Sequence, residues 1–165
     1  MTVDLCIENG LVLDGSGNPW YRANVSVKND KLVAITRSEI KEAKRVIDAR
    51  GLVVSPGFID MHSHSDFTLL AGADAESKIR QGTTTEVIGN CGVSAAPLEG
   101  AAVAAAGHGF MGNAEDLGVK ITWSSFSDYV ARLTRQGVVV NVACLIGHST
   151  VRTSTMGFEN RSPTP

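Results

Sequence analysis

Residues 57–66, GFIDMHSHSD, place two histidines one residue apart directly after a short apolar run. The chain contains four histidines, and two of them, His62 and His64, lie in this stretch. On a β-strand, side chains at positions i and i+2 share a face, with Cα atoms about 6.5–7 Å apart. Two imidazoles placed in this way can each give one nitrogen to a divalent metal. The alternative is that two hydrogen-bonded histidines end an ordinary strand, because short motifs have many false positives.

Strand and helix patterns alternate after this stretch. The candidates are a strand at 57–64, a helix at 74–81 that stops at Gly82, a β-branched strand at 83–92, a helix at 124–137 and an apolar strand at 137–147. The last is typical of a parallel strand that is buried on both faces. Residues 99–121 are rich in Ala and Gly and show no clear period. The alternation predicts the opening of an α/β domain with a parallel sheet over residues 56–165.

The first 55 residues have a different pattern, that of short strands joined by turns. Asn9-Gly10 inside an apolar run predicts one hairpin, and Asn29-Asp30 after an alternating run predicts a second. A turn at Gly51 separates two further apolar pairs. Residues 1–55 are therefore predicted to form a small antiparallel β unit.

Cys91 lies at the carboxyl end of the second predicted strand, next to Asn90. Functional residues gather at the carboxyl ends of strands in parallel α/β sheets. A thiolate there could bind or bridge a metal, and a cation would favour its deprotonated form. Two alternatives remain open: a small buried cysteine that packs as an apolar group, and a nucleophile, for which no nearby pair of histidine and carboxylate is apparent.

Other polar residues allow two interpretations each. His148 ends the third predicted strand and could line the same site or bond to the loop backbone. Asp66 could orient a ligand imidazole or cap the following turn. His108 is predicted to lie in a loop, and Cys6 and Cys144 within apolar strands are predicted to belong to the core.

Composition excludes several classes of protein. Hydrophobic residues make up 43% of the chain and charged residues 19%, a balance typical of globular proteins. The net charge of −2 gives no reason to expect nucleic acid or an anionic membrane as partner. We find no secretory signal, and no apolar run approaches the roughly 20 residues that span a bilayer. Three dispersed cysteines argue against a disulfide framework, so a cytoplasmic protein is expected.

Several motifs together resemble a known family. Residues 48–66, DARGLVVSPGFIDMHSHSD, resemble the entry into the catalytic barrel of the amidohydrolase superfamily. Residues 82–97, GTTTEVIGNCGVSAAP, with 140–152, VNVACLIGHSTVR, and 156–165, MGFENRSPTP, narrow the resemblance to the N-acyl-D-amino-acid deacylase (D-aminoacylase) family. The resemblance covers the whole chain, which corresponds to about the first third of a typical member.

This resemblance implies a metal-bearing (β/α)₈ TIM barrel beside a small β-sandwich built from both ends of the chain. Residues 1–55 would belong to the sandwich, and residues 56–165 would be the first three βα units of the barrel. His62 and His64 match the family's paired histidines, and Cys91 matches the cysteine that takes the metal-bridging place in the deacylases. The implied cofactor is Zn²⁺, as one or two ions. Asp66, Asn90 and His148 would lie next to the ligands or the substrate.

The implied function is metal-dependent hydrolysis of a non-peptide carbon–nitrogen bond, with an N-acyl-D-amino acid as the small-molecule substrate. Zinc would polarise the amide carbonyl and lower the pKa of bound water, and a late aspartate would serve as general base. That aspartate and the later histidines are expected beyond residue 165. Residues 162–165, SPTP, are typical of the start of a helix. An N-terminal fragment with little or no activity of its own is therefore expected.

Two alternative functions remain open. One is a cyclic-amide hydrolase of the dihydropyrimidinase or dihydroorotase kind, although such enzymes usually carry a bridging lysine and Cys91 argues against them. The other is a non-catalytic, truncated paralogue that acts as a partner subunit. The sequence gives no indication of the oligomeric state.

Overall fold

The computed structural model describes residues 2–72, 75–107 and 113–164. The chain divides into two compact units, Met1–Pro56 and Gly57–Pro165. Among the described residues no helix is long and apolar enough to cross a membrane. Asp74, where a helix was expected to begin, and His108, which was expected in a loop, lie outside the described residues.

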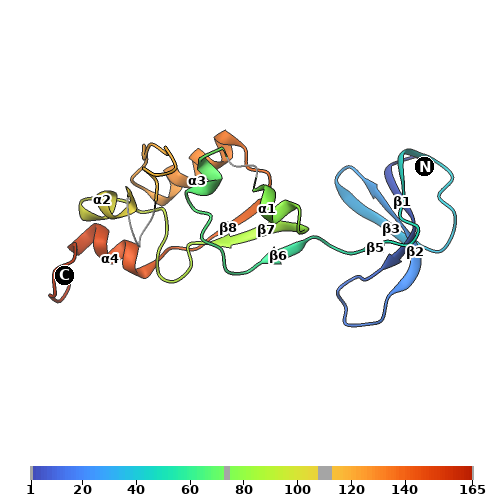
Figure 1. The fold of residues 1–165 in the computed structure, drawn as a ribbon, viewed down its shortest axis with the longest axis horizontal. Coiled ribbons are helices and arrows are strands. Elements are labelled where there is room, and N and C mark those ends of the chain that lie inside the picture. Colours follow the sequence, from blue (N-terminus) through green and yellow to red (C-terminus); the bar gives the residue numbers. More distant parts are fainter. Residues whose placement is uncertain (1, 73–74, 108–112, 165) are drawn as a thin grey trace. The chain divides into compact units, whose positions relative to one another are not determined.

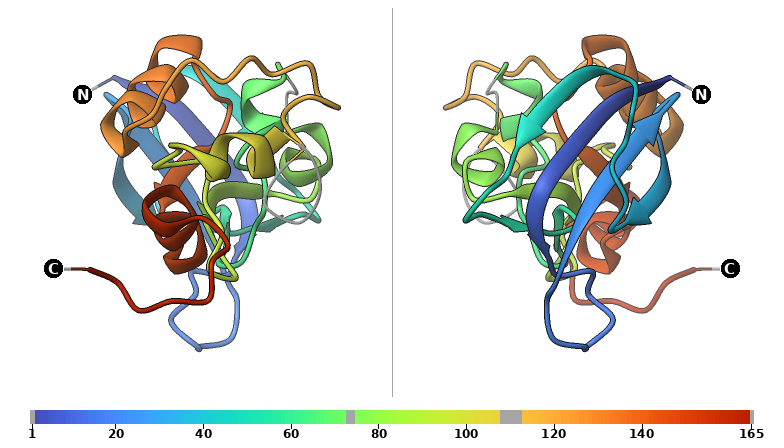
Figure 2. Two further views of the ribbon diagram at one scale, coloured as in Figure 1. Left: turned by 90° about the vertical axis from the view of Figure 1, so that its left-hand side faces the viewer. Right: turned by 90° about the vertical axis from the view of Figure 1, so that its right-hand side faces the viewer.

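The first unit is a sheet of five strands. These are β1 (Val3–Val12), β2 (Tyr21–Lys28), β3 (Lys31–Thr36), β4 (Ala43–Asp48) and β5 (Val53–Val54). The order is β3-β2-β1-β4, with β5 also paired to β1, and Figure 2 shows the strands side by side. The prediction of an antiparallel unit is wrong for two strands, because β4 and β5 both run parallel to β1. The reason is that the chain passes from β3 at one edge to β4 on the other side of β1, instead of turning back on its neighbour.

The hairpin predicted at Asn29-Asp30 is confirmed. These two residues join β2 to β3, and Lys28 pairs with Lys31 across the turn. Both turn residues have positive φ, 49° and 58°. Positive φ at both central residues suits a two-residue turn to the right-handed twist of the strands, and Asn and Asp tolerate it well.

The hairpin predicted at Asn9-Gly10 is wrong, because both residues lie inside β1. Asn9 has a φ of 62°, and the register with β2 shifts between Ile7 and Gly10. The left-handed residue therefore makes a bulge, after which the strand continues along the same partner. Gly10 is needed there, since a Cβ would lie 2.5 Å from Cγ2 of Val54.

The second unit contains three parallel strands in the order β6-β7-β8 (Figure 1). Their bounds are β6 (Phe58–Asp60), β7 (Thr83–Ile88) and β8 (Asn141–Cys144). The helical elements are η1 (Thr68–Leu70), α1 (Glu76–Ile79), α2 (Ala101–Gly107), α3 (Phe126–Gln136) and α4 (His148–Met156). Helical segments follow each strand, which confirms the predicted α/β class with a parallel sheet.

Three details of this unit differ from the prediction. The strand β6 ends at Asp60, so His62 and His64 lie in the loop that follows it. The strand β8 is not buried on both faces, because Asn141 and Ala143 are exposed among the described residues. Residues 162–164 are not helical.

Helix α2 was not predicted. Its sequence, AAVAAAG, gives no apolar period to detect, since nearly every residue is a small apolar one. The helix packs against α4 (Figure 1), and its Ala102 and Ala106 are buried in the core of the second unit. Burial of these alanines, rather than a contrast between an apolar and a polar face, accounts for the helix.

The core of the second unit lies between the sheet and its helices. Ile88 from β7, Leu98, and Tyr129 and Leu133 from α3 are buried in it. The indole of Trp123 donates to the Ala95 carbonyl at 2.6 Å. Tyr129 is 1% exposed, and its hydroxyl donates to the backbone carbonyl of Asp66 at 2.8 Å. This bond ties α3 to the loop that follows the paired histidines.

Replacing Tyr129 by Phe should lower the free energy of unfolding by about 1–3 kcal/mol, because the buried Asp66 carbonyl loses its donor. Thr134→Val is the control, since it removes an exposed hydroxyl from the same helix and should change stability by less than about 0.5 kcal/mol. Urea denaturation followed by circular dichroism measures both. Equal effects of the two substitutions would contradict the role given to Tyr129.

Candidate metal centre

Three predicted residues meet at the carboxyl ends of β6 and β7. The potential donor atoms of His62, His64 and Cys91 all lie within 4.8 Å of one another. Nε2 of His62 is 3.0 Å from Sγ of Cys91, and the two imidazole centroids are 5.4 Å apart with their planes at 60°. All three side chains are exposed. Adjacent parallel strands thus bring together residues separated by about thirty positions in sequence.

The chemistry of this donor set suits zinc. Two imidazole nitrogens and one thiolate sulfur are ligands that Zn²⁺ commonly takes. Three protein ligands leave one position of a tetrahedron open, which is typical of catalytic rather than structural zinc. No carboxylate among the described residues hydrogen-bonds to the His62 ring, so the contact between His62 and Cys91 does not extend into a cysteine–histidine–carboxylate triad.

Exposed and buried side chains alternate along the loop that carries the histidines. His62 and His64 are exposed, whereas Ser63 is 3% exposed and Ser65 is half-buried. The Ser63 amide donates to the Val87 carbonyl of β7 at 3.0 Å, which prolongs the strand pairing past the end of β6. The imidazoles therefore share one side of an extended segment, although the regular strand ends before them.

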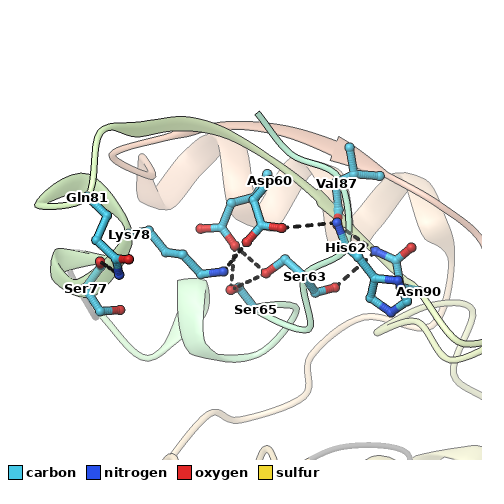
Figure 3. Close-up of polar contacts among 10 residues, drawn as sticks. Asp60, His62, Ser63, Ser65, Ser77, Lys78, Gln81, Val87 and Asn90 are labelled. Atoms are coloured by element: carbon cyan, nitrogen blue, oxygen red, sulfur yellow. Dashed lines mark hydrogen bonds and ion pairs between the residues drawn. The ribbon is translucent and has the colours of Figure 1, made fainter. Parts of the chain in front are cut away.

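Asp60 fixes the start of this loop. One carboxylate oxygen accepts from the His62 amide at 3.1 Å, and the other pairs with the Lys78 ammonium of α1 (Figure 3). The hydrogen bond from Lys78, followed by that from the His62 backbone, lowers the pKa of Asp60. Sequence reasoning missed this pair, because no local pattern relates positions 60 and 78.

Glu86 lies beneath the loop in the middle of β7. Its side chain is 0% exposed, and one carboxylate oxygen, Oε2, accepts hydrogen bonds from the hydroxyls of Ser63 and Ser65. Sequence reasoning missed this residue as well. A signal was present, since Glu86 is the one charged residue in the strand TTTEVI. A carboxylate at a buried position of a β-branched strand requires hydrogen-bond partners.

The turn that carries Cys91 is held by the beginning of α4. Cys91 itself has a φ of 55°. The Gly92 carbonyl accepts from the amide of Ser149 at 2.8 Å. Gly89 has a φ of 80°, and a Cβ on it would lie 2.2 Å from the Leu145 carbonyl oxygen. Only glycine can therefore occupy position 89 with this backbone, and the thiol is presented from a restrained turn.

Asn90 links the two loops of the site. Its side-chain amide donates to the Val87 carbonyl at 2.7 Å and to the Ser63 carbonyl at 3.2 Å (Figure 3). The side chain thus bridges the Cys91 turn and the residue between the two histidines. Among the described residues its contacts are with backbone groups that position the candidate ligands.

In the part of the chain that the structure describes, neither Asp66 nor His148 hydrogen-bonds to the imidazoles of the site. Asp66 is buried, and its carboxylate accepts from the Gly89 amide at 3.3 Å, while burial raises its pKa. It thereby supports the Cys91 turn. His148 is the exposed first residue of α4. Cys6 is fully buried, as predicted, and Cys144 is half-buried against the core.

Comparison with known proteins places these features in a family. Residues 45–165 match the amidohydrolase family. A D-aminoacylase from Alcaligenes xylosoxydans xylosoxydans is 40% identical over 161 residues, which are 98% of this chain and 32% of that protein. An N-acyl-D-glutamate deacylase from the same organism is 36% identical over 154 residues, which are 93% of this chain and 30% of that protein. The chain therefore spans about a third of the length of these relatives.

Solved structures give the same result. N-acyl-D-glutamate deacylase from Bordetella bronchiseptica, complexed with zinc and a phosphonate inhibitor, superposes with a TM-score of 0.84 at 35% identity. The match covers 99% of this chain and 33% of that one. A D-aminoacylase with a binuclear metal centre superposes with a TM-score of 0.83 at 38% identity, over 98% of this chain and 33% of that one.

Gly89→Ala should disrupt the Cys91 turn, because the new Cβ meets the Leu145 carbonyl oxygen. Gly137→Ala is the matched control, since Gly137 also has positive φ but nothing lies within 4 Å of a Cβ there. The strain of positive φ should lower the free energy of unfolding by about 1–2 kcal/mol in both variants, and the clash should add about 1–3 kcal/mol at position 89 alone. Equal losses in urea denaturation would show that the turn does not depend on this close approach.

Proposed function

The chain belongs to the amidohydrolase family, and we propose that it supplies part of the metal site of a deacylase that hydrolyses N-acyl-D-amino acids. The observation that carries this proposal is the convergence of His62, His64 and Cys91, with donor atoms within 4.8 Å of one another. The substrate class is supported by 40% and 36% identity to proteins named D-aminoacylase and N-acyl-D-glutamate deacylase.

In this proposal His62 and His64 each give one imidazole nitrogen to the metal, and Cys91 gives its thiolate. Bound Zn²⁺ supplies Lewis-acid chemistry, since it polarises an amide carbonyl and acidifies water. Zinc in the related N-acyl-D-glutamate deacylase and a binuclear centre in a D-aminoacylase support one or two ions as cofactor. The contribution of this chain is to hold three of the metal ligands in place.

We assign the first unit to a small β-sandwich and the second to the first three βα units of a (β/α)₈ barrel. Support comes from the three parallel strands β6, β7 and β8, each followed by helical segments. The candidate ligands lie at the carboxyl ends of these strands, where barrel enzymes place their active sites. The exposed His148 follows β8 at the same ends, a position from which it can face the substrate.

We further propose a reducing compartment, the cytoplasm, and a small molecule as the binding partner. The thiols of Cys6, Cys91 and Cys144 are all free, which fits a compartment where disulfides are rare. A net charge of −2 offers no attraction for nucleic acid.

Metal analysis tests the three ligands directly. His62→Ala, His64→Ala and Cys91→Ala should each weaken Zn²⁺ affinity by more than about 100-fold, because changes to mere supporting partners already cost about 10–100-fold. Met61→Ala, in the same loop and 67% exposed, and Cys144→Ala, which removes another thiol, are the controls and should keep full metal content. Zinc is measured by mass spectrometry after dialysis against buffered metal. Unchanged content in all three ligand variants would refute the assignment.

A hybrid enzyme tests the activity. Residues 1–165 replace the corresponding segment of the D-aminoacylase from Alcaligenes xylosoxydans xylosoxydans, to which 98% of this chain aligns. The hybrid should hydrolyse N-acetyl-D-amino acids in preference to their L-enantiomers. Cys91→Ala in the hybrid should lower kcat/KM by more than about 100-fold. A folded, zinc-loaded hybrid with no activity on any N-acyl-D-amino acid would contradict the proposed substrate class.

A further inference from the structure

The two residues that alternate with the histidines face a single buried carboxylate. We propose that Glu86 is the positioning residue that sets the geometry of His62 and His64, acting through Ser63 and Ser65. This inference rests on the proposed function, because it concerns the same metal site. Glu86 does not belong to the predicted ligand set, and its carboxylate is buried on the opposite side of the loop from the imidazoles.

The buried carboxylate of Glu86 depends on two hydrogen bonds from the histidine loop. The side chain is 0% exposed, and a buried carboxylate is costly unless hydrogen bonds compensate it. Oε2 accepts from the Ser65 hydroxyl at 2.7 Å and also from the Ser63 hydroxyl. Oε1 has no hydrogen-bond partner among the described residues. The hydroxyls of the two serines thus supply the hydrogen bonds that hold the carboxylate.

Ser63 is fixed at every polar atom it possesses. Its amide donates to the Val87 carbonyl at 3.0 Å, its carbonyl accepts from the Asn90 side chain at 3.2 Å, and its hydroxyl donates to Glu86. The residue between the two histidines therefore has little freedom to rotate. Since side chains of an extended segment alternate in direction, fixing Ser63 and Ser65 inward fixes His62 and His64 outward.

The charge of Glu86 has a nearby counterpart. The pKa of Lys78 is raised chiefly by its hydrogen bond to Asp60 and further by the negative charges of Asp60 and Glu86. Lys78 also pairs with Asp60, which accepts from the His62 amide. Figure 3 shows the Lys78 ammonium against the Asp60 carboxylate. Lys78 thus places a positive charge near the two carboxylates that hold the histidine loop.

The test compares metal binding by Glu86→Ala and Glu86→Gln in the full chain. Glu86→Ala should weaken Zn²⁺ and Co²⁺ affinity by about 10–100-fold, as measured by competition with a chromophoric chelator. Glu86→Gln keeps an acceptor oxygen for the serines, so affinity should recover to within about 10-fold of the original. In the Co²⁺ spectrum of Glu86→Ala, the ligand-field bands should shift while the thiolate charge-transfer band of Cys91 persists.

A purely structural role would lower the free energy of unfolding without changing the Co²⁺ spectrum of the folded fraction, and that result would overturn the inference. If Glu86→Ala does not fold, the double variant Ser63→Ala/Ser65→Ala replaces it in the test. This variant removes the same hydrogen bonds from the loop side. It should show the same spectral shift, and an unchanged spectrum would also overturn the inference.

Metal binding by the unmodified chain separates the two proposals. If the unmodified chain binds no metal through a thiolate, both the proposed metal site and the role of Glu86 are refuted. If it binds metal and the variants show the same affinity and Co²⁺ spectrum, only the role of Glu86 is refuted.

Discussion

Parallel pairing between β6 and β7 brings the candidate ligands together, since it aligns the carboxyl ends of two strands that helical segments separate in sequence. The bond from the Ser63 amide to the Val87 carbonyl extends this pairing beyond the regular strand. The histidine loop and the Cys91 turn therefore lie next to each other, at the ends of neighbouring strands. Without that alignment, neither motif has enough donors for a metal site.

Two different devices restrain the two sides of the site. On the histidine side, a buried carboxylate holds the inward-facing serines, and Asp60 with Lys78 holds the start of the loop. On the cysteine side, the backbone itself restrains the turn. Gly89 permits a close approach to the Leu145 carbonyl, and the Gly92 carbonyl accepts a hydrogen bond from the Ser149 amide at the start of α4. Restraint of both loops by the surrounding fold leaves little reorganisation to be done when a metal binds.

The alternation of strand and helix patterns allowed the α/β class and the parallel strands to be anticipated. The meeting of His62, His64 and Cys91 was anticipated from strand-end position together with the resemblance to the deacylase family. The sequence misled at Asn9-Gly10, where the same dipeptide chemistry that makes a hairpin makes a bulge once the strand finds a continuous partner. The helix α2 escaped detection because alanines carry no amphipathic signal. Glu86 and the Asp60–Lys78 pair also escaped, since their roles arise from contacts between positions about 20 residues apart.

The central claim is that two imidazoles and one thiolate of this chain bind one zinc ion. Zinc K-edge X-ray absorption on the zinc-loaded chain measures this most directly. The account predicts one sulfur at about 2.3 Å, with nitrogen and oxygen neighbours at about 2.0–2.2 Å. It also predicts that the sulfur shell disappears in Cys91→Ala. A first shell made only of nitrogen and oxygen in the unmodified chain would contradict the account.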